Sequence, residues 1–168
     1  MSLDITHQVL EKINREKPPL YFSKKPQIKK TPEELVGLGF RFWMAGYQTN
    51  DFEFWKKTWD HFNRTIGASA ARSTVFELAS WAQTVQSSAL RDIEVCLTEQ
   101  EQFGRDERMA ITMVAAGQHN ACPAMQACAS ALIGATEVEN VIEASTDFGH
   151  KLLEKRLLLS DLKTEIVD

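Results

Sequence analysis

The sequence predicts an all-α fold, a single-domain bundle of six or seven helices around a central aromatic-rich helix. Apolar residues recur at helical spacing along most of the 168-residue chain, and no stretch shows the sustained two-residue alternation of a β-strand. Helix-start signals, in which a capping residue precedes acidic side chains, recur at residues 31–34, 50–53 and 136–139. Glycines stand where helices are expected to stop, at Gly67, Gly104 and Gly134.

The chain divides into an N-terminal arm and a helical body. Residues 1–31 are predicted to hold a short amphipathic helix, over residues 3–16, and a basic, proline-rich arm. The segment 17–32 contains four of the five prolines and no acidic residue, so it cannot form a regular helix and is predicted to be extended. Residues 32–168 form the predicted all-α helical domain, which is large enough to bury a core without disulfides.

The charge of the chain is unevenly distributed. Residues 1–31 carry seven basic and three acidic side chains, whereas residues 32–168 carry twelve basic and twenty acidic ones. The basic arm can therefore dock on the acidic body or reach a separate acidic partner. Basic residues beside aromatic ones also suit single-stranded nucleic acid, although the acidic body opposes such binding. The candidates for a nucleic-acid contact are Lys24, Lys25, Lys29 and Lys30.

The first helix of the body is predicted over residues 32–48 and is apolar nearly all round. Only a narrow strip is polar, with Glu34, Arg41 and Gln48. A helix of this kind is buried on both sides. We therefore expect it either at the centre of the domain or at a subunit interface.

The second helix of the body is predicted over residues 51–66 and is clearly amphipathic. Nine of the fifteen aromatic residues of the chain fall in residues 40–62, and many of them belong to this helix. One apolar stripe, expected to face the core, contains Phe52, Trp55, Trp59, Phe62 and Ile66. Phe54 lies on the far side of this helix, on the same face as Thr58 and His61.

Four further helices complete the predicted domain. They cover residues 69–103, with room for a break, then 105–119, 123–133 and 137–159. The last of them is amphipathic, and its polar face carries Glu139, Glu143, Asp147, His150 and Glu154.

The aromatic surface around residues 35–62 favours contact with another protein. Aromatic side chains are preferred anchors of interfaces, and no catalytic motif competes with this interpretation. The sequence therefore predicts a non-enzymatic interaction or regulatory domain that acts as a homo-oligomer, most simply a homodimer. The candidate partner-binding residues are Leu35, Leu38, Phe42, Phe54, Thr58 and His61.

A small-ligand- or metal-binding helical bundle, with or without enzymatic activity, is the alternative hypothesis. Pockets between helices that are lined by aromatic side chains and a few polar groups are common ligand sites. The candidate pocket residues are Trp43, Tyr47, Trp55, His119 and Cys122. A nucleic-acid-binding regulator that uses the basic arm is a further alternative.

No metal or cofactor is predicted. Asp147 and His150 have the spacing of the ligand pairs in di-metal bundles, but such a site needs a second pair and two more inward carboxylates. Cys122 and Cys128 are six residues apart and would diverge on one helix, so a four-ligand zinc site is not indicated.

Cys122 is the best candidate for a reactive thiol. It stands at an expected helix start, where a thiolate is favoured, and His119 is a conceivable base. No orienting acid is identifiable, so no catalytic residue is predicted. The position of Pro123 also suits a structural role, in which Asn120 or Cys122 caps the helix.

The first residues of the chain contain no apolar signal core, and the number of cysteines, three, is odd. These features predict free thiols in a reducing cytoplasm. The uncharged stretch 109–136 is rich in Ala and Gly and includes polar residues and a proline. A membrane span is therefore not predicted.

Overall fold

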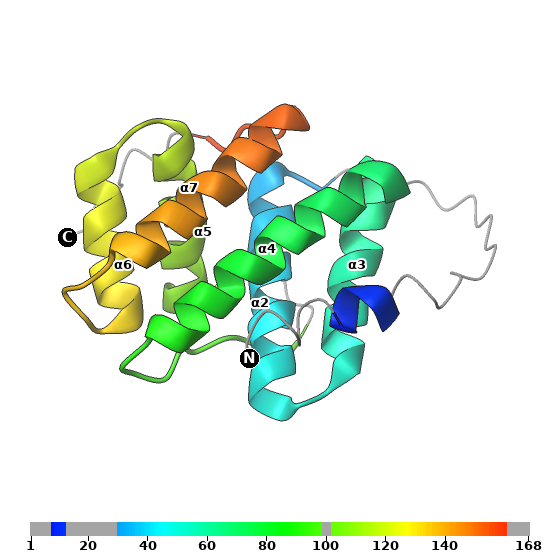
Figure 1. The fold of residues 1–168 in the computed structure, drawn as a ribbon, viewed down its shortest axis with the longest axis horizontal. Helices are drawn as coiled ribbons and strands as arrows, with labels where there is room; N and C mark the ends of the chain where they lie inside the picture. Colours follow the sequence, from blue (N-terminus) through cyan, green and yellow to red (C-terminus); the bar gives the residue numbers. More distant parts are fainter. Residues whose placement is uncertain (1–7, 13–29, 99–101, 161–168) are drawn as a thin grey trace.

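The computed structural model describes residues 8–12, 30–98 and 102–160, and these ranges form a bundle of α-helices with no strand among them (Figure 1). Residues 8–12 are a short helical piece. The longer helices are α2 (Pro32–Thr49), α3 (Phe52–Ile66), α4 (Ala68–Ser88), α5 (Arg105–Gln118), α6 (Cys122–Ile133) and α7 (Glu139–Glu154). The predicted all-α class is confirmed. Most of the predicted helix 3–16 and of the basic arm lies outside the described residues.

The N-termini of α2 and α3 are capped by the residues that the sequence indicates. At α2 the backbone N–H of Glu34 donates to Thr31 Oγ1 at 3.2 Å, and the Thr31 N–H donates to Glu34 Oε2 at 2.9 Å. At α3 the Asp51 carboxylate accepts from the Glu53 N–H at 3.0 Å. The side-chain cap predicted for the last helix is absent, because α7 begins after Val138 and not after Thr136.

The predicted helix 69–103 is broken. α4 ends at Ser88, where Ala89 turns to an extended conformation, and residues 89–98 continue without helix. The Leu90 N–H donates to the carbonyl of Ile133 at 2.7 Å, so the chain leaves the helix where it meets the end of α6. The last predicted helix is also shorter than expected, since Arg156 adopts a left-handed φ of 60° just after α7.

Two helices, α4 and α5, make contacts with most of the others. α4 crosses the molecule and contacts α2, α3, α6 and α7, while α5 contacts α2, α6 and α7 (Figure 1). α2 is buried from residue 35 to residue 46, between α3, α4 and α5. The middle of the bundle is therefore shared by α2, α4 and α5. Among the described helices, none combines the length and the apolar character needed to cross a membrane.

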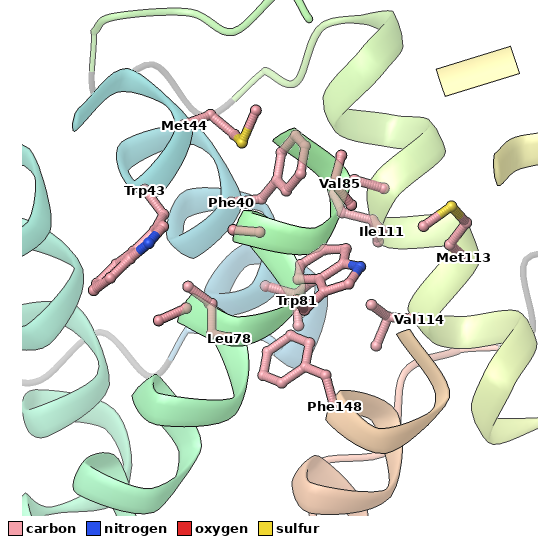
Figure 2. Packing of buried hydrophobic residues seen from close by; sticks show 14 of the residues in the cluster. Phe40, Trp43, Met44, Leu78, Trp81, Val85, Ile111, Met113, Val114 and Phe148 are labelled. Atoms are coloured by element: carbon pink, nitrogen blue, oxygen red, sulfur yellow. The ribbon is translucent and has the colours of Figure 1, made fainter. Parts of the chain in front are cut away.

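An aromatic stack links three helices at the core (Figure 2). The ring of Trp81, from α4, lies between Phe40 of α2 and Phe148 of α7. Its centroid is 5.2 Å from the Phe40 ring and 5.1 Å from the Phe148 ring, and all three side chains are fully buried. The Trp81 indole N–H donates to Ser145 Oγ at 2.9 Å, which satisfies its polar atom inside the core.

Candidate functional site

Most of the predicted partner-binding side chains are buried within the chain. Leu35, Phe42 and Thr58 have no exposed surface, and Leu38 is 6 % exposed. Phe42 stacks on His61, with centroids 5.5 Å apart and planes 10° apart, and lies 6.2 Å from the Phe54 ring. The structure thus brings together three members of the predicted set, Phe42 of α2 with Phe54 and His61 of α3. Of the six predicted residues, only Phe54 and His61 are partly exposed.

The three aromatic pocket candidates fill the space between their own helices. The Trp43 and Trp55 rings lie 5.7 Å apart, and the Tyr47 ring meets Trp55 edge-on at 5.6 Å. The Trp55 indole N–H donates to the Trp43 carbonyl at 3.1 Å. Gly46 packs against this indole so closely that an added Cβ would lie 2.4 Å from its nitrogen. These side chains therefore pack against one another as core residues.

His119 and Cys122, the two other pocket candidates, lie at the turn between α5 and α6. The side chain of His119 is exposed, and its Nε2 is 2.8 Å from the Leu159 carbonyl oxygen. Cys122 is exposed at the first position of α6. The residue before it, Ala121, is the N-cap and makes no side-chain cap, so the predicted capping by Asn120 or Cys122 is wrong.

The remaining candidates are placed as follows. Asp147 and His150 are both exposed on α7, and no group of three His, Cys, Asp or Glu side chains in the described ranges is placed to hold a metal ion. Lys30 is partly buried just before α2. Lys24, Lys25 and Lys29 lie outside the described residues.

A shallow groove runs between α4 and α7, which lie side by side (Figure 1). Its volume is about 390 Å³. Carboxylates line it at Glu77, Glu143 and Asp147, and hydroxyl groups line it at Ser80, Thr84, Ser87 and Ser88. Asn140, Ala144 and Trp81 complete the lining. Trp81 has no exposed surface, so the groove rests on the aromatic stack of the core.

The groove presents oxygen atoms to the solvent. Its three carboxylates are accompanied by no basic side chain in the lining. The Thr84 and Ser87 hydroxyls donate to backbone carbonyls of their own helix, at 2.9 and 3.2 Å, and their oxygens keep free lone pairs. The groove is therefore a surface of hydrogen-bond acceptors with negative charge, which suits a cationic, hydrogen-bond-donating group.

The most strongly buried charges of the described structure form an ion pair that the sequence did not reveal. Arg41 was expected on a polar strip of its helix, but it is fully buried and pairs with Glu107 of α5, which is also fully buried. Arg41 Nε donates to Glu107 Oε1 at 2.7 Å and Nη2 donates to Oε2 at 3.0 Å. The hydrogen bond with Glu107 is the main reason that the pKa of Arg41 is raised.

This pair also fastens the segment that follows α4. Arg41 donates to the carbonyls of Thr98 and Gln102, at 3.0 and 2.8 Å. The Glu107 carboxylate accepts from the backbone N–H groups of Cys96 and Gly104, at 3.1 and 2.7 Å. The ion pair thus satisfies backbone groups that no helix or strand can satisfy.

A second pair fastens the beginning of the same segment. Both oxygens of Asp106 accept from Arg91 Nη2, and Asp106 Oδ2 also accepts from the Glu94 N–H at 2.8 Å. Arg91 Nη1 donates to the Leu132 carbonyl of α6 at 2.7 Å. The Arg41–Glu107 pair joins α2 to α5, and Arg91 of the irregular segment contacts both α5 and α6, so both ion pairs have a clear structural role.

No known protein family matches this sequence, and neither a curated protein nor a solved structure is detectably similar to it. The groove between α4 and α7 is therefore assessed on its own geometry and chemistry.

The three cysteines differ enough to be separated by chemical labelling. Hydrogen bonding to Thr98 lowers the pKa of Cys96, whereas burial raises the pKa of Cys128. Cys122 is exposed. Because the thiolate is the nucleophile, we expect Cys128 to react most slowly with an aromatic disulfide reagent near neutral pH. Labelling rates of variants that keep one cysteine each measure this order, and equal rates would contradict it.

Proposed function

We propose that this chain is a non-enzymatic helical domain that works through protein–protein contact as a homo-oligomer, and that the α4–α7 groove is its contact surface. The observation that carries the proposal is the acidic, hydroxyl-rich lining of this groove. The aromatic residues of α2 and α3 are assigned to the core and not to the contact surface, because most of them are buried in the chain.

The shape of the groove favours a protein segment over a small molecule. Small-molecule sites enclose most of the ligand surface and are lined mainly by apolar groups. This groove is open to solvent, and its lining is predominantly polar. A chain segment that lies along two helices can use such a surface, because its side chains reach the acceptors from one side.

The charge of the groove specifies the chemistry of the segment. The groove carries carboxylates at Glu77, Glu143 and Asp147. A partner segment that complements them carries Lys or Arg side chains, which donate charge-assisted hydrogen bonds to carboxylates. Such exposed pairs contribute only about 0.2–1 kcal/mol each and are screened by salt. We therefore expect a contact of modest affinity that weakens as the ionic strength rises.

Sedimentation velocity on the full chain tests the proposal. We expect the average mass to rise from that of one chain toward that of two as the protein concentration increases from low to high micromolar, at low ionic strength. High salt is expected to reverse the association. A mass of one chain at every concentration and salt level would contradict the homo-oligomeric function.

A further inference from the structure

We propose that the α4–α7 groove of one copy receives the lysine-rich segment 24–30 of a second copy. This inference rests on the proposed function, and it names the partner that the groove accepts. The acidic groove is described by the structure, and the occupant is identified by its sequence.

Charge complementarity within one chain supports this occupant. The segment 24–30 contains Lys24, Lys25, Lys29 and Lys30 and no acidic residue. The groove contributes three carboxylates and no basic side chain. A surface that combines both charges on the same molecule can associate with a copy of itself, because each copy offers the groove and the segment that the other needs.

The dimensions of the two parts also agree. The lining residues of α4 extend from Glu77 to Ser88, which corresponds to about 16 Å along a helix axis. Seven residues, the length of the segment 24–30, cover about 19 Å when their backbone is extended. A segment of this length is sufficient to follow the groove, with lysines near both of its ends.

The described ends of the arm lie on helices other than those that form the groove. Lys12, at the end of the described N-terminal helical piece, lies over the Phe52 ring of α3 at 4.6 Å. Val9 is buried at 7 % exposure, and Lys30 precedes Thr31, the N-cap of α2. The arm thus starts and ends on α2 and α3, whereas the groove belongs to α4 and α7. Reciprocal docking gives a dimer two equivalent contacts.

Three variants of the full chain test the inference by sedimentation velocity. The groove variant carries Glu77→Gln, Glu143→Gln and Asp147→Asn. The arm variant carries Lys24→Gln, Lys25→Gln, Lys29→Gln and Lys30→Gln. The control variant makes the same charge change as the groove variant at exposed acidic residues outside the groove, with Glu53→Gln, Asp92→Asn and Glu137→Gln.

We expect the groove and arm variants each to raise the dissociation constant by about ten-fold or more, because every exposed charge pair contributes a factor of roughly 1.4 to 5. The control variant is expected to stay within about two-fold of the parent, since the affected residues lie outside the contact. Circular dichroism melting of each variant verifies that the fold is retained.

A mixture of the groove and arm variants distinguishes docking between copies from docking within one chain. An intact arm on one copy and an intact groove on the other restore one of the two contacts, so we expect the equimolar mixture to associate more tightly than either variant alone. If the mixture does not associate, or if all variants dimerise like the parent, the inference is overturned. In the second case the homo-oligomeric function itself remains, whereas a monomeric parent removes both.

Discussion

Replacing Arg41 with methionine is expected to lower the free energy of unfolding by about 3–5 kcal/mol, because the change leaves the fully buried Glu107 carboxylate without its counter-charge. Urea unfolding followed by circular dichroism measures the loss. The size of the effect comes from the buried location of both groups. Exposed ion pairs of similar geometry contribute about 0.2–1 kcal/mol.

The hydrogen bonds of the pair enlarge this effect. Arg41 also donates to the Thr98 and Gln102 carbonyls, and Glu107 also accepts from the Cys96 and Gly104 N–H groups. Methionine fills a similar volume but donates to none of these oxygens. We therefore expect the segment that joins α4 to α5 to lose protection from hydrogen exchange in this variant before the rest of the fold does.

A double variant separates the effect of the unpaired charge from the effect of the lost hydrogen bonds. The double variant Arg41→Met with Glu107→Leu removes both charges, so it is expected to be more stable than Arg41→Met alone. It is still expected to be less stable than the parent, because Cys96 and Gly104 lose the acceptor of their backbone N–H groups. If Arg41→Met costs less than about 1 kcal/mol, water or another group compensates Glu107 and the pair is less buried in solution.

The helices could be predicted where their signals are local. α2 and α3 start and end within a residue of the predicted ranges, because a capping residue and an apolar periodicity mark each of them. The end of α4 could not be predicted in this way. Its position is connected to a hydrogen bond from Leu90 to Ile133, a residue far along the chain, and only the folded structure brings the two together.

The sequence also shows polar positions without showing what they face. Arg41 and Gln48 form part of a polar strip on α2, which is the usual mark of a solvated edge. In the fold this strip faces the segment after α4: Gln48 donates to the Ile93 carbonyl at 2.6 Å, and Arg41 is buried. A buried strip and a solvated strip have the same periodicity, so the tertiary partner decides between them.

The candidate site depended on a pairing of helices that periodicity does not give. The polar face of α7 was predicted, including Glu143 and Asp147. That this face borders a groove follows from its packing against α4, where Glu77 and the hydroxyl residues supply the second wall. The predicted partner surface on α2 and α3 was based on the aromatic content of these helices. Most of the side chains predicted for it are covered by the chain itself.

Replacing Trp81 with alanine is expected to cost about 3–5 kcal/mol of unfolding free energy, because the change opens a cavity in the middle of the aromatic stack. Trp81 has no exposed surface and packs between Phe40 and Phe148, at centroid distances of 5.2 and 5.1 Å (Figure 2). These rings join α2, α4 and α7, so all three helices lose packing together. Trp81 lies outside the aromatic-rich stretch 40–62, so the density of aromatic residues along the sequence does not mark this position.

The indole nitrogen gives this prediction an internal control. Its N–H donates to Ser145 Oγ, and the Ser145 hydroxyl in turn donates to the Val141 carbonyl at 2.7 Å. Ser145→Ala keeps the ring but leaves the indole N–H buried without an acceptor, which is expected to cost about 1–3 kcal/mol. Trp81→Phe removes the indole donor and part of the ring. If packing contributes more than the hydrogen bond, this variant loses an unfolding free energy between the losses of Ser145→Ala and Trp81→Ala. Urea unfolding of all three variants ranks them, and a Trp81→Ala variant no less stable than Ser145→Ala would mean that the surrounding rings close the cavity.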